Sequence, residues 1–286
     1  MRRDERSSEE RRAAMSTVGF VGAGRMGAPM VERLVQAGHA VRVLGRTPQK
    51  RADIEELGAS PVAGVTALAE DADVVVVCVF TDEQVREVCV DDGLLAAMPA
   101  GSVLVVHTTG SPTTAGLLAA RAPEVAVVDA PVSGGPHDIA AGHITLFVGG
   151  EDAAVERARS VLAAYGDPIL HMGGLGAGQW MKLINNTLFA AQLGMLSEAA
   201  AFAARVGVDE TALLDALGHG SGASRAAEIV GTRGSVRSFI DSVGEFLGKD
   251  VAVVREVAAE TGADLGALEG LLDTVVATPS GGRPRR

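Results

Sequence analysis

Short, continuous apolar runs alternate with helix-like stretches along the first half of the chain. The runs are rich in valine, and they occupy residues 17–21, 40–44, 73–80, 102–107, 125–130 and 143–150. Uninterrupted apolar runs are typical of strands that are buried on both faces of a parallel sheet. Because the strands alternate with helices, the pattern predicts a doubly wound α/β sheet.

The pattern changes near residue 175, where the strand signals stop. Residues 178–206 form a predicted helix that is apolar on nearly every side, which indicates burial on most sides. Further helices are expected at 209–218, 244–260 and 265–276. We therefore expect a doubly wound parallel sheet over 16–175, then an all-helical domain over 176–277. The tails 1–15 and 278–286 are expected to be disordered.

The composition narrows the classes of partner. The formal net charge is -11, which disfavours nucleic acids and anionic membrane surfaces, because both select positively charged proteins. No apolar run approaches the ~18 residues of a membrane span. The two cysteines, Cys78 and Cys89, are too few for a disulfide framework. The first residues lack the apolar core of a secretory signal, so we expect a cytoplasmic protein.

A glycine-rich turn follows the first predicted strand. Gly22, Gly24 and Gly27 have the spacing G-x-G-x-x-G, with a strand before them and a helix after them. In a Rossmann fold, the first glycine permits a tight turn, the second lets a pyrophosphate approach the backbone, and the third lets helix and strand pack closely. The helix N-terminus adds N–H groups for the phosphates. The context predicts dinucleotide binding, with a purely structural turn as the alternative.

The choice of cofactor is expected at the end of the second strand. Proteins that prefer NAD usually have an acidic residue there for the ribose 2′-hydroxyl. This chain has Arg46 and Thr47 at that position, followed by Lys50, and no acid. Because a guanidinium fits a 2′-phosphate, the sequence predicts that NADPH is preferred over NADH. The alternative is that Arg46 is a solvated loop residue.

Three further segments carry a specific pattern. They are HTTGSP at 107–112, DAPVSGG at 129–135 and GLGAGQWMKLINN at 174–186. With the glycine turn they resemble the β-hydroxyacid dehydrogenase family, which includes 3-hydroxyisobutyrate dehydrogenases and tartronate semialdehyde reductases. The resemblance covers roughly residues 17–277 and implies a 6-phosphogluconate dehydrogenase-like NAD-binding domain. His107 departs from it, because the family usually has an acid there.

The resemblance implies a role for individual residues. Lys182 matches the lysine of the motif GxGxxxKxxNN and is the expected catalytic group. The residues expected to bind substrate are Ser133, Gly134, Gly135, Thr109, Asn186 and Asp250. Those expected to bind the cofactor are Gly22, Ala23, Gly24, Arg25, Met26, Gly27, Arg46, Thr47, Lys50, Val79, Phe80, Thr109 and Lys249.

Elementary chemistry supports this assignment. A small anionic carboxylate substrate needs an anion-binding turn, and Ser133 with two glycines offers a hydroxyl and N–H groups. Lys182 and Asn186 are four residues apart, so both lie on one face of the predicted helix. The lysine would give a proton to the forming alkoxide during carbonyl reduction, or take it during oxidation. Asn185 lies off this line, and we expect it to be structural. The spacing of the histidines predicts no metal site.

Two alternatives are open at the level of sequence. An imine reductase shares the fold and NADPH use but usually lacks the lysine, so Lys182 argues against it. A non-catalytic NADPH-binding module is of another class, and the presence of Ser133, Lys182 and Asn186 together argues against it. The long apolar helix also predicts a homodimer or higher homo-oligomer formed through the helical domain.

Overall fold

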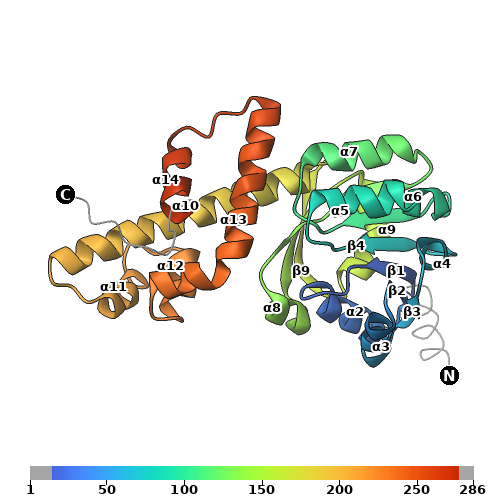
Figure 1. The fold of residues 1–286 in the computed structure, drawn as a ribbon, viewed down its shortest axis with the longest axis horizontal. Helices are drawn as coiled ribbons and strands as arrows, with labels where there is room; N and C mark the ends of the chain where they lie inside the picture. The colour runs from blue at the N-terminus through green and yellow to red at the C-terminus, as the bar shows by residue number, and fades with distance from the viewer. Residues whose placement is uncertain (1–14, 277–286) are drawn as a thin grey trace, which may run out of the picture. The chain divides into compact units, whose positions relative to one another are not determined.

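The computed structural model describes residues 15–276, so the predicted tails, 1–15 and 278–286, lie outside the described residues apart from Met15. The chain divides into two compact units, 1–182 and 183–286 (Figure 1). The division falls seven residues after the boundary expected from the sequence, because helix α10 (Ala177–Arg205) begins in the first unit and continues into the second.

The first unit is built on one sheet, with the strand order β3-β2-β1-β4-β5-β6-β8-β7 and β9 paired to β8. Six neighbouring strands are parallel: β3 (Ser60–Val62), β2 (Ala40–Leu44), β1 (Thr17–Val21), β4 (Val74–Val77), β5 (Val103–Val106) and β6 (Ala126–Asp129). Five of them were predicted from the sequence, and β3 was not. The order reverses between β1 and β4. In open α/β sheets, ligands bind beyond the carboxyl ends of the strands at such a reversal.

The far edge of the sheet is mixed rather than parallel. Strand β8 (Ile144–Gly149) is antiparallel to β6 and to the short β7 (Val132–Ser133), and β9 (Gly166–Gly173) is parallel to β8. The prediction of a strand over 143–150 is therefore confirmed, but its assignment to a parallel sheet is wrong. A continuous apolar run reports burial on both faces and carries no information on strand direction.

Helices cover both faces of this sheet. One face packs against α2 (Gly27–Gln36), α3 (Pro48–Glu56), α8 (Pro136–Ala141) and α9 (Asp152–Leu162). The other packs against α4 (Val65–Ala69), α5 (Asp82–Arg86), the π-helical turn η1 (Glu87–Asp91), α6 (Leu94–Ala97) and α7 (Pro112–Arg121). Alternate residues of β4 enter the two cores, which explains its uninterrupted valines.

The second unit is helical. After α10 it contains α11 (Glu210–Leu217), α12 (Arg225–Gly231), α13 (Val236–Thr261) and α14 (Ala267–Val276), around an apolar core. The sequence placed the start of α13 eight residues too late and missed α12. Each helix is preceded by a capping serine whose hydroxyl accepts a backbone N–H, Ser224 for α12 and Ser235 for α13. By length and composition α10 could cross a membrane, a test that core helices also pass.

Candidate functional site

The glycine turn has the backbone geometry that the motif predicts. Gly22 has φ of 98°, and a Cβ there would lie 2.1 Å from the carbonyl oxygen of Cys78. A Cβ on Gly27 would lie 2.1 Å from the carbonyl oxygen of Gly22. No side chain fits either position without displacing backbone, so both glycines are required by the fold.

Gly24 is different, because a Cβ built on it would meet no atom within 4 Å. It lies on the exposed side of the turn, before helix α2. The helix is preceded by Met26, which makes no side-chain capping hydrogen bond, and the first turn holds no acidic residue. Open space in front of the N–H groups of a helix N-terminus is suited to a phosphate. The turn therefore fits a pyrophosphate.

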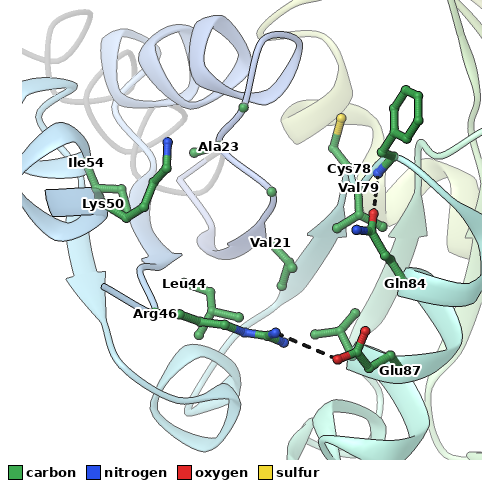
Figure 2. Close-up of a pocket in the computed structure, with 14 residues that line it drawn as sticks. Val21, Ala23, Leu44, Arg46, Lys50, Ile54, Cys78, Val79, Gln84 and Glu87 are labelled. Atoms are coloured by element: carbon green, nitrogen blue, oxygen red, sulfur yellow. Dashed lines mark hydrogen bonds and ion pairs between the residues drawn. The ribbon is translucent and has the colours of Figure 1, made fainter. Parts of the chain in front are cut away.

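A cavity of about 380 Å³ adjoins this turn (Figure 2). It is bounded by the ends of β1, β2 and β4 and by the helices that follow them. Among the residues predicted to bind the cofactor, it is lined by Gly22, Ala23, Gly24, Arg46, Lys50, Val79 and Phe80. Its lining also includes residues that no sequence motif indicated: Val21, Leu44, Ile54, Cys78, Gln84, Glu87 and Val88.

Arg46 is held by acidic residues from the opposite wall. Its guanidinium lies 3.9 Å from the Glu87 carboxylate and also pairs with Asp92, and all three side chains are more than one-third exposed. Figure 2 shows Arg46 extending from the end of β2 toward Glu87. Lys50 is 3.6 Å from Asp53 in its own helix. Thr47 caps helix α3, because its hydroxyl accepts the backbone N–H of Lys50.

Other predicted cofactor residues lie outside the cavity lining. Arg25, Met26 and Gly27 belong to the turn and the first residue of α2. Thr109 is half-buried in the loop after β5, and Lys249 is in α13 of the second unit. The structure therefore brings together the part of the predicted site that would hold the phosphates and the adenosine.

Asp129 connects the end of β6 to the start of α10. Its side chain is fully buried, and its two carboxylate oxygens accept the backbone N–H groups of Gly176 at 2.6 Å and Gln179 at 2.7 Å. Burial raises the pKa of Asp129, and the backbone N–H donors partly oppose that shift. A Cβ on Gly178 would lie 2.8 Å from the same carboxylate. The aspartate of DAPVSGG thus anchors the helix that carries Lys182.

The loop after β5 is tied to its neighbours by buried polar side chains. Thr108 exchanges two hydrogen bonds with the backbone of Val79, accepting its N–H and donating to its carbonyl, both at 3.0 Å. His107 contacts the carbonyl oxygen of Ala130 through Nδ1 and the hydroxyl of Tyr165 through Nε2. Burial lowers the pKa of His107 to about 4, so the imidazole is neutral at pH 7.

The predicted carboxylate-binding turn is partly engaged within the protein. Gly135 donates its N–H to the carboxylate of Asp138 at 2.7 Å. Gly134 is exposed and has φ of 132°, a conformation that favours glycine. Ser133 is half-buried in β7. The turn therefore presents Ser133 and Gly134 more readily than Gly135 to a substrate.

In the second unit, Asn186 is buried and donates its side-chain N–H to the carboxylate of Asp250 at 2.9 Å. Asn185, whose role the sequence did not explain, donates to the oxygen of Asn186 at 3.3 Å. Lys249 lies 4.0 Å from Asp250. These contacts orient the Asn186 amide. Lys182, half-buried, lies one helical turn before Asn186 in α10. Within residues 15–276, no group of three metal-ligating side chains is present.

A sheet with a strand-order reversal, an open glycine turn and a cavity beside it defines a dinucleotide-binding protein. Two protein-family models match the chain. The model described as the NAD binding domain of 6-phosphogluconate dehydrogenase matches residues 17–174. The model described as NAD-binding of NADP-dependent 3-hydroxyisobutyrate dehydrogenase matches residues 176–282.

The chain is also similar to individual dehydrogenases and to their solved structures. An NAD-dependent L-serine dehydrogenase of Pseudomonas aeruginosa is 35% identical over 218 residues, covering 75% of this chain and 73% of the relative. A probable 3-hydroxyisobutyrate dehydrogenase of Mycobacterium tuberculosis is 37% identical, covering 71% and 69%. The solved structure of the Mycobacterium tuberculosis 3-hydroxyisobutyrate dehydrogenase with L-serine has a TM-score of 0.82 at 30% identity, covering 92% of this chain and 93% of that chain.

The chain belongs to the β-hydroxyacid dehydrogenase family and is an NAD(P)-dependent oxidoreductase of the 3-hydroxyisobutyrate dehydrogenase-like type. Imine reductase-like proteins share the fold alone. A reductive aminase of Aspergillus terreus has a TM-score of 0.61 at 22% identity.

Proposed function

We propose that this protein transfers a hydride between NADPH and a small β-hydroxy acid or the corresponding aldehyde acid, with Lys182 as the general acid and base. The observation that supports this most is the arrangement of α10. It carries Lys182 one turn before Asn186, and the Asn186 amide is oriented by Asp250. A lysine and a fixed amide on one helical face suit a substrate that bears a reacting oxygen.

Each group has a defined task in this proposal. When bound, the nicotinamide supplies or accepts the hydride. Lys182 donates a proton to the carbonyl oxygen during reduction and takes the hydroxyl proton during oxidation. Ser133 and Gly134 bind the substrate carboxylate, and Asn186 holds the substrate in place. Because free lysine has a pKa of about 10.4, oxidation near neutral pH requires an environment that favours the neutral amine.

The substrate class is supported by the relatives. L-Serine and 3-hydroxyisobutyrate, named for the relatives above, share a carboxylate and a hydroxyl on the β-carbon. We propose the same class here, with the β-oxygen as the reacting atom.

The preference for NADPH is proposed from the charges in the cavity. Arg46 and Lys50 line it, and residues 44–50 contain no acid that would accept a ribose 2′-hydroxyl. Glu87 and Asp92 compete with a 2′-phosphate for Arg46. The preference is therefore expected to be moderate, since the arginine must leave these partners to bind the phosphate.

We propose that a second copy of the chain covers one face of α10. Ile184, Leu188, Met195 and Phe202 are exposed, and their spacings of four and seven residues place them on one helical face. A stripe along a helix can pack on itself across a two-fold axis. The same helix carries Lys182, Asn185 and Asn186, polar groups that are costly in lipid, so a membrane is the less favoured occupant.

The function is tested by measuring nicotinamide oxidation and reduction with wild type and Lys182→Ala. Substrates are L-serine, 3-hydroxyisobutyrate, tartronate semialdehyde, succinic semialdehyde, glyoxylate and methylmalonate semialdehyde, each with both cofactors. We expect turnover on at least one, and a loss of kcat of about 10²-fold or more in the variant. Equal activity in the variant would remove Lys182 from the mechanism. Cofactor binding without any turnover would support a non-catalytic module.

A further inference from the structure

The side chain of Gln179 bridges the two peptide groups on either side of Thr109. Its amide nitrogen donates to the carbonyl oxygen of Thr108 at 2.7 Å, and its amide oxygen accepts the N–H of Gly110 at 3.1 Å. Gln179 is 2% exposed. The carboxamide therefore binds the backbone of the loop after β5 at two points, with Thr109 between them.

The two contacts fix the orientation of the amide. A carbonyl can only accept a hydrogen bond and an N–H can only donate one, so the amide nitrogen must face Thr108 and the oxygen must face Gly110. Buried polar groups need such partners, because those left without one are strongly unfavourable. Exchanging Gln179 for an apolar residue would leave both loop groups without their partner, and the loop would have to move to find another.

Gln179 is itself held at its backbone. Its N–H donates to Asp129 at the end of β6, while Thr108 is bonded to Val79 at the end of β4. A continuous set of buried contacts thus joins the carboxyl ends of β4, β5 and β6 to the start of α10. All of these residues belong to the first compact unit, as does Lys182, three residues after Gln179 on the same helix.

We propose that Gln179 is a positioning residue for the reaction, which fixes Thr109 relative to the helical turn that carries Lys182. The inference rests on the proposed function, since it concerns Lys182, which is assigned there to the proton, and Thr109, which the family resemblance assigns to both the substrate and the cofactor. Gln179 touches neither substrate nor cofactor in this proposal. It acts through the Thr109 loop, and misplacement of that loop by a fraction of an ångström would slow hydride transfer more than it weakens cofactor binding.

The test is a double-mutant cycle on single-turnover hydride transfer, with wild type, Gln179→Met, Thr109→Ala and the double variant. Methionine matches glutamine in length without its amide. We expect Gln179→Met to slow hydride transfer by about 10-fold or more, with the Kd for NADPH changed less than about 3-fold. In the double variant, the loss should equal that of Thr109→Ala alone, because Gln179 acts through that loop. Losses that multiply would overturn the proposal.

A control variant, a replacement variant and a hydrogen-exchange measurement complete the test. Gln192→Met, on the same helix but outside this set of contacts, serves as the control and should transfer hydride at the wild-type rate. If Gln179→Met does not fold, Gln179→Glu replaces it, since glutamate keeps the acceptor for Gly110 and loses the donor to Thr108. If wild type turns over none of the substrates, the proposed function is wrong. The rate of hydrogen exchange at the Gly110 amide then tests whether Gln179 holds the Thr109 loop. Faster exchange of the Gly110 amide in the variant supports the bridge, and unchanged exchange overturns it.

Discussion

The hydroxyl of Tyr165 lies 2.8 Å from Nε2 of His107, and both side chains are buried. On its other side, Nδ1 of His107 is 2.5 Å from the carbonyl oxygen of Ala130. Because the carbonyl only accepts, Nδ1 carries the proton and Nε2 accepts the Tyr165 hydroxyl. Burial also raises the pKa of Tyr165, so the tyrosine remains a donor. The neutral pair joins the loop after β5 to the segment that leads into Ser133.

This pair predicts a dependence of stability on pH. The pKa of His107 falls from 6.5 to about 4 on folding, so between these values the unfolded chain binds more protons than the folded one. Stability is full above pH 6.5 and is lost as pH falls toward 4, by up to about 3 kcal/mol. Urea unfolding of wild type and His107→Gln at several pH values measures the difference in slope.

The control for that experiment is His143→Gln, because His143 is exposed. Burial also lowers the pKa of His39, so part of the slope should persist in His107→Gln. If the free energy of unfolding depends on pH in the same way in wild type and His107→Gln, His107 does not have the lowered pKa that its burial requires.

Asp129→Asn should destabilise the first unit. The carboxylate accepts two backbone N–H groups, whereas asparagine presents one oxygen and an amide nitrogen that cannot accept. One buried N–H would lose its partner, at about 1–3 kcal/mol. Chemical denaturation measures the change, with the exposed Asp215→Asn as control. Equal stability of the two variants would mean that the helix start is held by other contacts.

Removing the acidic partners of Arg46 should favour NADPH. With Glu87→Gln and Asp92→Asn combined, Arg46 no longer has to leave an ion pair, and the negative potential beside the 2′-phosphate falls. Both ion pairs of Arg46 are accessible to solvent, which makes them weak. We therefore expect the ratio of NADPH to NADH affinity to rise only about 2- to 5-fold. Fluorescence titration with both dinucleotides measures it, and Asp91→Asn, which removes one nearby negative charge that is not paired with Arg46, serves as the control for each single variant, Glu87→Gln and Asp92→Asn. An unchanged ratio would count against a role for Arg46 in selectivity.

The two cysteines should react differently with N-ethylmaleimide. Cys78 is half-buried and lines the cavity, whereas Cys89 is buried, which raises its pKa to about 12. Since the thiolate is the reactive form, Cys89 should stay unlabelled in the folded protein. Saturating NADPH should slow the labelling of Cys78, as followed by mass spectrometry with Cys78→Ser as control. An equal rate of Cys78 labelling with and without NADPH would show that the cofactor binds outside this cavity.

The exposed face of α10 predicts the oligomeric state. Wild type should elute at a mass of at least two chains in light scattering, and Phe202→Glu should shift it toward one chain, because a charge cannot be buried unpaired at the interface. Leu117→Glu, at an exposed apolar position on α7 outside this face, is the control. A monomeric wild type that pellets with lipid vesicles would identify a membrane as the partner.

The parts of the fold that were predicted from the sequence are those that leave a local pattern. Valine runs mark buried strands, and the three glycines mark a backbone that no side chain fits. Strands β3 and β7 are only three and two residues long, too short for a period to be recognised. The direction of β8 depends on its neighbours, which a single segment cannot encode.

The supporting contacts of the site were missed for a related reason. Asp129 and Gln179 meet across 50 residues of sequence, and Gln179 reaches Thr108 across 71. Both residues lie in motifs found in the sequence, DAPVSGG and GLGAGQWMKLINN, but a motif does not specify which distant residue each side chain contacts. The sequence also does not reveal the role of Asn185, whose side chain donates a hydrogen bond to the side chain of the next residue, Asn186.

The glycine turn has a consequence for the engineering of this enzyme class. Gly22 and Gly27 are closed to side chains by backbone oxygens, whereas the space beside Gly24 is open. The fold therefore requires two of the glycines, and under the proposed function the third leaves room for the dinucleotide. A chain that has exchanged Gly24 for a larger residue would keep the architecture of its relatives while losing their chemistry. Under the proposed function, the residue at position 24 would thus separate chains that keep only the fold from chains that also keep dinucleotide binding.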